Sequence, residues 1–274
     1  MSPGRLVLCA GPIGNLGDAP PRLAESLASA SIVFAEDTRR ARTLLQHLGV
    51  DRPVRSYFVG NEADRASELA ERLEAGETVA LLTDAGMPSI ADPGLSAVRV
   101  AIDVGAAVTA VPGPSAVTMA VAVSGLPADR FVFEGFLPRK GRERRDRLEA
   151  LAGEARTTVV FCAPRRLAAD LADLRESCGD RPVAVCREMT KLYEEVWRGS
   201  LGEAVDEWAG REVRGEVTVV LGGAPEAEPD LDAAVDLVRE EIAAGAAQSA
   251  AVKDVAARTG VRRRALYEAV LREL

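Results

Sequence analysis

Two carboxylates, Asp84 and Asp92, stand in a turn-rich segment, residues 81–94, with the sequence LLTDAGMPSIADPG. The segment includes the end of an apolar run, residues 78–83, that is typical of a parallel strand covered on both faces. Open α/β sheets bind ligands where such strands end. We expect Asp84 to orient a ligand there and Asp92 to cap a helix that begins at Pro93. A plain strand-to-helix connection has the same composition, so the rest of the chain must decide between the two readings.

A second charged group, with the sequence EDTRR, follows an expected strand at residues 32–35. Because the carboxyl ends of parallel strands meet at one edge of a sheet, Glu36 and Asp37 are expected at the level of Asp84. A carboxylate at this edge could accept a proton from a reacting hydroxyl. Asp37 could equally cap the helix that follows it.

Several common site types are absent from the sequence. The glycines of the first loop fall at positions 11, 14 and 17, which is not the dinucleotide-binding spacing, and no P-loop pattern occurs. The four cysteines are irregularly spaced and His47 is the only histidine. These features argue against a structural zinc site and against a disulfide framework.

The composition is that of a globular chain of 274 residues, with 47% hydrophobic and 28% charged residues and a net charge of -8. The negative charge argues against indiscriminate binding of polyanions. Two local basic clusters could still hold a phosphate backbone, although each could also be a solvated helix face. The candidate contacts are Arg139, Lys140, Arg144, Arg145, Arg262 and Arg263. No apolar run is long enough to span a bilayer and the start does not fit a signal peptide, so we expect a cytoplasmic protein without a membrane segment.

The order of elements predicts an α/β fold in two domains. Repeated strand, loop and helix patterns over residues 1–124 indicate a mostly parallel sheet with helices on both faces. Residues 125–224 form a second α/β domain, in which clustered strands suggest antiparallel pairs. After a Gly- and Pro-rich linker, residues 230–274 form a helical tail, which is either a helix-turn-helix or a small helical cap.

Seven ordered motifs carry a resemblance to a known family: AGPIGNLGD, FAEDTRR, LLTDAGMPSIADPG, VPGPSA, GLPADRFVFEGFLPRK, CREMTKLYEEVWRG and RGEVTVVLGG. In this order they closely resemble the ribosomal RNA small-subunit methyltransferase I family, within the tetrapyrrole-methylase (class III) group of S-adenosylmethionine-dependent enzymes. The resemblance implies a homodimer of two-domain α/β subunits that binds S-adenosylmethionine in the cleft between the domains. It also implies 2'-O-methylation of a cytidine in the decoding region of 16S ribosomal RNA, with the small ribosomal subunit as partner.

The resemblance also assigns roles to residues. The residues implied to bind the cofactor are Pro12, Gly14, Asp84, Ala85, Gly86, Ile90, Ser115, Ala116, Phe161, Met189, Thr190, Gly215, Glu216 and Val217. On the RNA side of the cleft it places Arg39, Arg40, Asn61 and Glu62, together with the basic clusters. Two departures from the family pattern occur: Cys162 and Ala163 stand where a Glu-Ser pair is usual, and residues 57–60 lack a usual histidine.

With no histidine at that point, the candidates for the base that activates the hydroxyl are the carboxylates of Glu36, Asp37, Glu62 and Glu188 and the amine of Lys191. Asp37 and Glu188 are the favoured candidates, with Lys191 as a further one. Two other functions stay open on the sequence: methylation of a tetrapyrrole on the same frame, and noncatalytic RNA binding in ribosome assembly. The first predicts binding of a porphyrinogen, and the second predicts no binding of S-adenosylmethionine.

Overall fold

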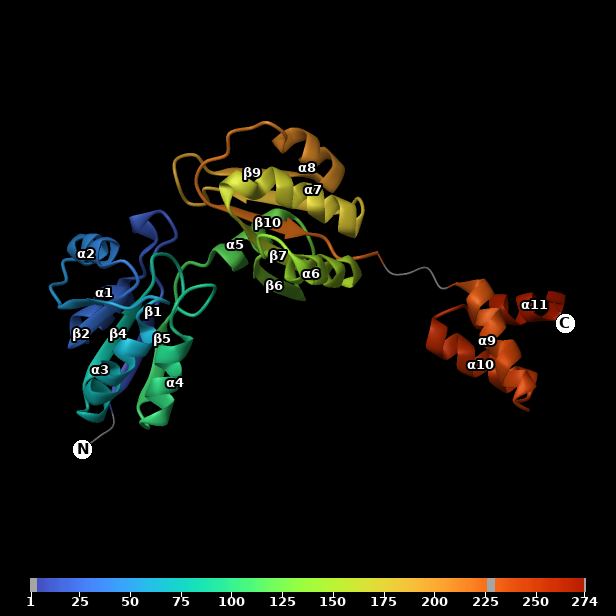
Figure 1. Ribbon diagram of the computed structural model, residues 1–274, viewed down its shortest axis with the longest axis horizontal. Helices are drawn as coiled ribbons and strands as arrows, with labels where there is room; N and C mark the ends of the chain where they lie inside the picture. The colour runs from blue at the N-terminus through green and yellow to red at the C-terminus, as the bar shows by residue number, and fades with distance from the viewer. Residues whose placement is uncertain (1–3, 226–229, 274) are drawn as a thin grey trace. The chain divides into compact units, whose positions relative to one another are not determined.

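The computed structural model describes residues 4–225 and 230–273. The chain divides into two compact units, Met1–Ala224 and Pro225–Leu274. The first unit contains two five-stranded sheets covered by helices, and the second contains three helices (Figure 1). The predicted α/β class with a helical tail is confirmed.

The first sheet is entirely parallel, with the strand order β3-β2-β4-β1-β5. Its strands are β1 (Arg5–Cys9), β2 (Ile32–Ala35), β3 (Val54–Ser56), β4 (Thr78–Leu82) and β5 (Ala107–Val111). The central strands are apolar throughout because both faces are covered. One face packs against α1 (Pro21–Ser29) and α2 (Thr38–His47), and the other against α3 (Glu62–Glu74) and α4 (Leu95–Asp103).

Because all five strands are parallel, the loops that follow them lie at one edge of the first sheet, among them the loops after β1, β2, β4 and β5. The loop after β1, which includes a 3-10 turn at Leu16–Asp18, is tied to the loop after β4 by a small antiparallel bridge. In this bridge the Gly11 N–H donates to the Gly86 carbonyl at 2.9 Å, and the Gly86 N–H donates to the Gly11 carbonyl at 3.2 Å. The two loops are therefore held side by side.

The second sheet has the strand order β6-β7-β10-β8-β9. Its strands are β6 (Phe131–Phe136), β7 (Thr157–Cys162), β8 (Pro182–Arg187), β9 (Glu195–Ser200) and β10 (Val217–Leu221). Only the β6 and β7 pair is parallel, so antiparallel pairs are present as predicted.

Helices cover both faces of the second sheet. On one face lie α6 (Arg142–Gly153), α7 (Leu167–Cys178) and α8 (Leu201–Trp208), after a 3-10 turn at Pro164–Arg166. The other face packs against α5 (Ala116–Ser124), which follows the last strand of the first sheet. The N-terminus of α5 therefore lies where the two sheets meet.

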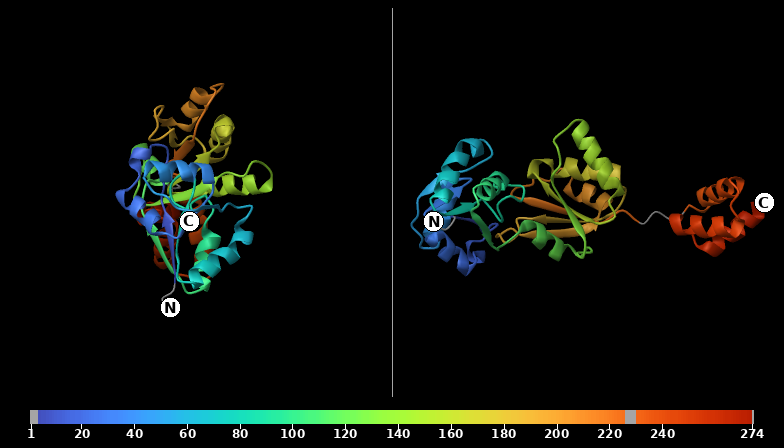
Figure 2. Two further views of the ribbon diagram at one scale, coloured as in Figure 1. Left: turned by 90° about the vertical axis from the view of Figure 1, so that its left-hand side faces the viewer. Right: turned by 90° about the horizontal axis from the view of Figure 1, so that it is seen from below.

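The second unit is a three-helix bundle, seen from two further sides in Figure 2. It consists of α9 (Leu231–Ala243), α10 (Gln248–Thr259) and α11 (Arg263–Glu273), packed around Val238, Val255 and Leu266. Gly260 ends α10 with a φ of 73°, a conformation that glycine adopts without strain. The turn has the outline of a helix-turn-helix. Among the described residues, no helix is both long and apolar enough to cross a membrane.

Candidate active site

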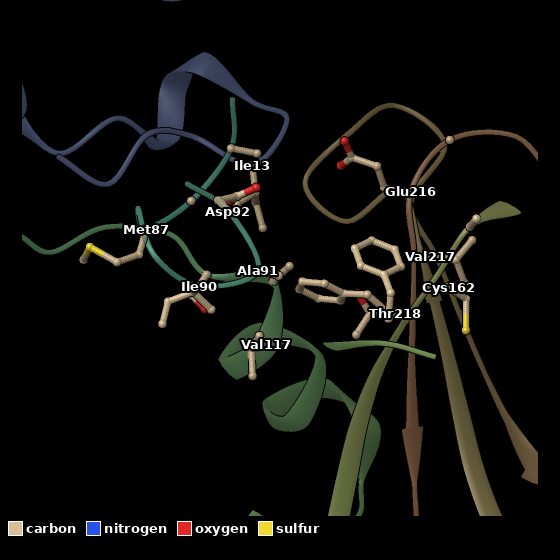
Figure 3. A pocket seen from close by; sticks show the side chains of 18 of the residues that line it. Ile13, Met87, Ile90, Ala91, Asp92, Val117, Cys162, Glu216, Val217 and Thr218 are labelled. Atoms are coloured by element: carbon tan, nitrogen blue, oxygen red, sulfur yellow. The ribbon is translucent and has the colours of Figure 1, made fainter. Parts of the chain in front are cut away.

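A cavity of about 390 Å³ opens between the loops of the first sheet and the start of β10 (Figure 3). Its size is that of a site for a small organic ligand, and its wall is largely apolar. It is lined by Ile13, Ala85, Gly86, Met87, Ile90, Ala91, Asp92, Ser115, Ala116, Val117, Phe136, Phe161, Cys162, Ala163, Pro164, Gly215, Glu216, Val217 and Thr218. We call this the first cavity.

The loop after β4 forms one wall and has an unusual backbone. Ser89 and Ala91 adopt positive φ angles of 74° and 60°, which cost on the order of 1–3 kcal/mol each for residues with a Cβ. The Ser89 N–H donates to the Pro93 carbonyl at 3.1 Å and closes the loop on itself. Gly94 is required beside it, because a Cβ there would lie 2.7 Å from the Ser89 hydroxyl. The Gly94 N–H donates to Glu62 at 3.2 Å.

Asp92 does not cap a helix, and that prediction is wrong. Gly94 precedes the first residue of α4, Leu95, and this helix start has no side-chain cap. The Asp92 side chain instead lies in the wall of the first cavity (Figure 3). Burial raises the pKa of its carboxyl group to about 7, and the negative charges of Glu36, Asp84 and Glu216 add to the effect.

Asp84 links the loop after β4 to the loop after β2. Its Oδ1 accepts the Asp37 N–H at 3.1 Å and its Oδ2 pairs with Arg40 at 3.3 Å. In return the Asp84 N–H donates to Glu36 at 3.4 Å. Burial raises the pKa of Glu36, against the opposing effect of that hydrogen bond. Glu36 and Asp84 are thus neighbours, as expected from the parallel sheet.

Asp37, a favoured candidate for the base, is fully engaged by Arg39. Its side chain caps α2 by accepting the Arg39 N–H at 2.8 Å. The Arg39 guanidinium also donates to both of its carboxylate oxygens, at 3.2 and 2.7 Å. These hydrogen bonds hold the pKa of Asp37 well below its ordinary value, which makes it a weak base.

Glu188 and Lys191, the other candidates, form an ion-pair network with Glu216. The Lys191 Nζ lies 2.8 Å from Glu188 Oε1 and 3.0 Å from Glu216 Oε2, and the Glu216 N–H donates to Glu188 at 2.9 Å. Burial disfavours the charged forms of Glu188 and Lys191, but these hydrogen bonds stabilise the charged forms by more. The pKa of Glu188 is lowered and that of Lys191 is raised, so Lys191 is a cation and has no lone pair to act as a base.

The Lys191 stem crosses from the second sheet to the first loop. A Cβ at Gly14 would lie 2.5 Å from Lys191 Cγ, so only glycine leaves room for the stem. Glu188 and Thr190, which both precede Lys191 in the chain, have positive φ angles of 50° and 68°. The tight CREMTK turn therefore joins the two halves of the first unit.

A second cavity of about 320 Å³ adjoins the first. It is lined by Gly11, Pro12, Ile13, Gly14, Leu16, Arg40, Ala41, Thr43, Leu44, Leu82, Thr83, Asp84, Ala85, Lys191 and Glu216. Three residues, Ile13, Ala85 and Glu216, line both cavities. The second cavity has more charged residues in its wall than the first.

The predicted cofactor residues divide between the two cavities. Those in the first cavity are Ala85, Gly86, Ile90, Ser115, Ala116, Phe161, Gly215, Glu216 and Val217. Pro12, Gly14 and Asp84 line the second cavity. Met189 is buried against α5, and the Thr190 hydroxyl is buried without a hydrogen-bond partner in the described part of the chain.

Sequence reasoning missed Asp92 and Phe136 as wall residues of the first cavity. The ring of Phe136 lies 5.5 Å from that of Phe161, centroid to centroid. Strict strand alternation in FVFEGF would place Phe136 on the face opposite Phe133, so the sequence held no plain signal for its position. The register shift between Phe133 and Gly135 brings both rings against Phe161.

The first cavity fits a cofactor that carries an adenine, a carboxylate and a cationic sulfur. The aromatic pair Phe136 and Phe161 offers a stacking surface for a flat ring. Ser115 makes no side-chain cap to α5, so the first-turn N–H groups of that helix lack intrahelical partners and can bind a carboxylate. The half-buried carboxylate of Asp92 suits a nearby positive charge. The described residues contain no cluster of metal-binding side chains.

The predicted RNA contacts are exposed, with three exceptions. Arg39, Arg40, Arg139, Lys140, Arg145, Arg262 and Arg263 are exposed. Asn61 and Glu62 are half-buried, and Asn61 hydrogen-bonds with Phe58 and Ser56. Arg144 is a correction: its guanidinium is buried, donates to Asp170 at 2.7 Å and pairs with Asp173, so it joins α6 to α7 and is not available to a phosphate.

Comparisons with known proteins agree with this geometry. Residues 5–205 match the family model described as Tetrapyrrole (Corrin/Porphyrin) Methylases. A Mycobacterium tuberculosis protein named ribosomal RNA small subunit methyltransferase I is 51% identical over 99% of this chain and 96% of its own length. A Pseudomonas aeruginosa protein of the same name is 40% identical over 99% of this chain and 98% of its own.

Solved structures show the same fold at low sequence identity. A uroporphyrin-III C-methyltransferase from Thermus thermophilus, complexed with S-adenosylhomocysteine, has a TM-score of 0.56 at 21% identity, over 80% of this chain and 97% of that chain. A diphthine synthase has a TM-score of 0.62 at 15% identity, over 80% of this chain and 89% of its own. Both likenesses concern the fold alone.

Proposed function

The chain belongs to the ribosomal RNA small subunit methyltransferase I family, within the tetrapyrrole methylases, and we propose that it methylates a cytidine 2'-hydroxyl in the decoding region of 16S ribosomal RNA. Its methyl donor is S-adenosylmethionine. Family membership confirms the resemblance carried by the seven sequence motifs. The 2'-oxygen, the cytidine and the position in the decoding region belong to the proposal.

The observation that supports the proposal is the pair of adjoining cavities. The first is apolar with aromatic and helix-terminal groups, which suits the methyl donor. The second carries Arg40 and Lys191 in its wall, which suits a nucleotide of an anionic strand. Because Ile13, Ala85 and Glu216 border both, a hydroxyl in the second cavity can approach a methyl group held in the first.

When bound, S-adenosylmethionine supplies a methyl group on a positively charged sulfur. Ala116 and Val117 at the α5 N-terminus would hold its carboxylate, and Phe161 would stack on its adenine. Arg40 would position the acceptor strand without reading its bases. The exposed residues Arg139 and Lys140 would add phosphate contacts.

We further propose that the protein acts as a homodimer in the cytoplasm, where its ribosomal substrate is made. The edge strands β5 and β6 and the neighbouring helix α4 leave large apolar side chains uncovered, among them Ile102 at 62% and Phe136 at 59% exposure. Such a surface on a folded unit commonly marks an interface. Analytical ultracentrifugation should give twice the chain mass of 29.0 kDa, and Ile102→Asp should shift the protein toward the monomer.

Among the alternatives, a tetrapyrrole acceptor has the weaker support. The relatives that are 40–51% identical over nearly the whole chain are named for ribosomal RNA. The solved uroporphyrin, precorrin and related methyltransferase structures are 18–21% identical to this chain, a level that shows the fold only. A noncatalytic assembly protein does not account for a cavity that fits the methyl donor.

The test uses purified protein and S-adenosylmethionine with a labelled methyl group. Assembled small subunits, free 16S ribosomal RNA and a uroporphyrinogen are offered in parallel. Nuclease digestion and mass spectrometry should find the label in 2'-O-methylcytidine from one of the RNA samples. Label on a base, label in the porphyrinogen or no label in any sample would contradict the proposal.

A further inference from the structure

The charged groups around the two cavities are almost all engaged with one another. Asp37 is held by Arg39, and Asp84 by Arg40. Glu188 and Glu216 are both held by Lys191. Carboxylates that are paired with a cation in this way shape the cleft but are poor proton acceptors, because the cation stabilises their ionised form.

Asp92 differs from all of them. Its carboxylate has no hydrogen bond or ion pair with any described residue, although the side chain is only half exposed. It lies in the wall of the first cavity beside Ile13, which also borders the second (Figure 3). The backbone holds it in place through the strained turn at Ser89 and Ala91. Strain of this kind persists where it serves a site.

The surroundings of Asp92 are mainly acidic. Glu36 faces it from the end of β2, Asp84 from the end of β4 and Glu216 from the start of β10. The cations in the wall of the second cavity, Arg40 and Lys191, pair with Asp84 and Glu216 and not with Asp92. Crowded negative charge and partial burial both favour the protonated form, so this carboxyl group binds a proton readily near neutral pH.

We propose that Asp92 accepts the proton of the acceptor hydroxyl during methyl transfer, an inference that rests on the proposed function. As the hydroxyl oxygen forms its bond to the methyl carbon, the carbon–sulfur bond breaks and its electron pair stays on sulfur. The hydroxyl proton passes to an Asp92 carboxylate oxygen. Charge balances because the cationic sulfur becomes a neutral thioether while the carboxylate becomes a neutral acid.

This assignment explains why Asp37, Glu188 and Lys191 are poorer candidates. A general base works best when its pKa lies near the working pH. The hydrogen bonds of Asp37 and Glu188 lower their pKa values, and Lys191 is kept protonated. Asp92, whose pKa is about 7, is matched to the task.

The first experiment measures single-turnover methylation of the RNA substrate against pH at saturating S-adenosylmethionine. Asp92→Asn should lower the rate by about 100-fold or more, the usual contribution of general-base catalysis. For the wild-type protein, the single-turnover rate should rise with pH through an inflection below 7, because the bound cationic sulfur favours the ionised form of Asp92, and that acid limb should be absent from the residual activity of the variant. Asp206→Asn, an exposed aspartate on α8, is the matched control and should behave as the wild type.

The second experiment needs no acceptor. Calorimetric binding of S-adenosylmethionine at pH 7 is compared in two buffers that differ in ionisation enthalpy. A cationic sulfur close to Asp92 favours its ionised form, so binding to the wild type should release up to about half a proton. Asp92→Asn should release none of it and should keep the cofactor Kd within a few fold of the wild type.

The outcomes separate the possibilities. A wild-type chemical rate with an unchanged pH profile in Asp92→Asn would overturn the assignment while leaving the proposed function intact. A large rise in cofactor Kd with a normal rate at saturation would also overturn it, because Asp92 would then be a ligand of the cofactor ammonium group. If the wild-type protein itself does not methylate a ribose, the proposed function fails first, and this is seen before any variant is made.

Discussion

Asp92→Asn should make the folded protein more stable at neutral pH, because it removes a carboxylate from an unfavourable place. The pKa of Asp92 rises from 3.8 to about 7 on folding. At about 1.4 kcal/mol for each pH unit, the shift corresponds to an upper limit of about 4 kcal/mol. The side chain is close to half exposed, so solvent screening reduces the expected gain to about 1–2 kcal/mol.

The direction of the pH dependence follows from the raised pKa of Asp92. Below about pH 4 the carboxyl group is protonated in both folded and unfolded states, and its ionisation does not affect stability. Between pH 4 and pH 7 the unfolded chain loses the proton more easily, so the wild type loses stability as pH rises. The advantage of the variant should therefore be greatest at pH 8 and smaller at pH 5.

Thermal unfolding followed by circular dichroism from pH 5 to pH 8 measures this effect. For a domain of this size, about 1–2 kcal/mol corresponds to a rise in Tm of about 2–8 °C. Asp206→Asn should leave the Tm unchanged at every pH. An Asp92→Asn protein that is less stable at pH 8, or whose advantage does not change with pH, would refute the account of Asp92 given above.

Three further predictions concern the frame around the site. Arg144→Ala should cost about 3 kcal/mol of stability, since it leaves the buried carboxylate of Asp170 with only Arg166 as a partner, at 3.4 Å, whereas exposed Arg145→Ala should leave the Tm within 1–2 °C of the wild type in the same thermal scan. Gly94→Ala should raise the cofactor Kd measured by calorimetry at least several fold, because the new Cβ would meet Ser89 and distort the cavity wall; an unchanged Kd would show that the loop tolerates it. Thr43→Trp should fill the second cavity and abolish RNA methylation while calorimetry finds cofactor binding intact, and normal methylation would place the acceptor elsewhere.

The sheets could be predicted from the sequence because their strands are continuous apolar runs. The expected strand at residues 32–35 coincides with β2, and the apolar run 78–83 contains β4. A buried strand is seen in the sequence as an apolar run between turn residues, and this pattern is local, so a single sequence is enough to find it. The pairing order of the strands depends on contacts between distant segments, so the sequence supported only a general parallel or antiparallel arrangement.

The basic segment 139–147 shows where charge alone misleads. Arg144 was grouped with its neighbours as a phosphate contact, yet it lies on the inner face of α6 in line with Leu148 and Leu151. The spacing of four and three residues was a readable signal for burial. Its partners Asp170 and Asp173 lie on α7, and the sequence of the basic segment alone does not predict this contact.

The sequence predicted Asp92 as a helix cap because Asp followed by Pro is a common start of a helix. Ser89 and Ala91 have positive φ angles, and the helix begins only at Leu95, after this loop. Serine and alanine do not favour positive φ angles, so these angles are imposed by the closed loop and could not be predicted from the residue types. The pKa of Asp92 depends on carboxylates that follow β2 and β4 and precede β10. Those three positions, Glu36, Asp84 and Glu216, span 180 residues of the chain and belong to both sheets, so the property arises only when both sheets assemble. The same assembly pairs Asp37, Asp84, Glu188 and Glu216 with Arg39, Arg40 and Lys191. Glu36 and Asp92 have raised pKa values and no ion pair with a described residue, and of these two only Asp92 lies in the wall of the first cavity.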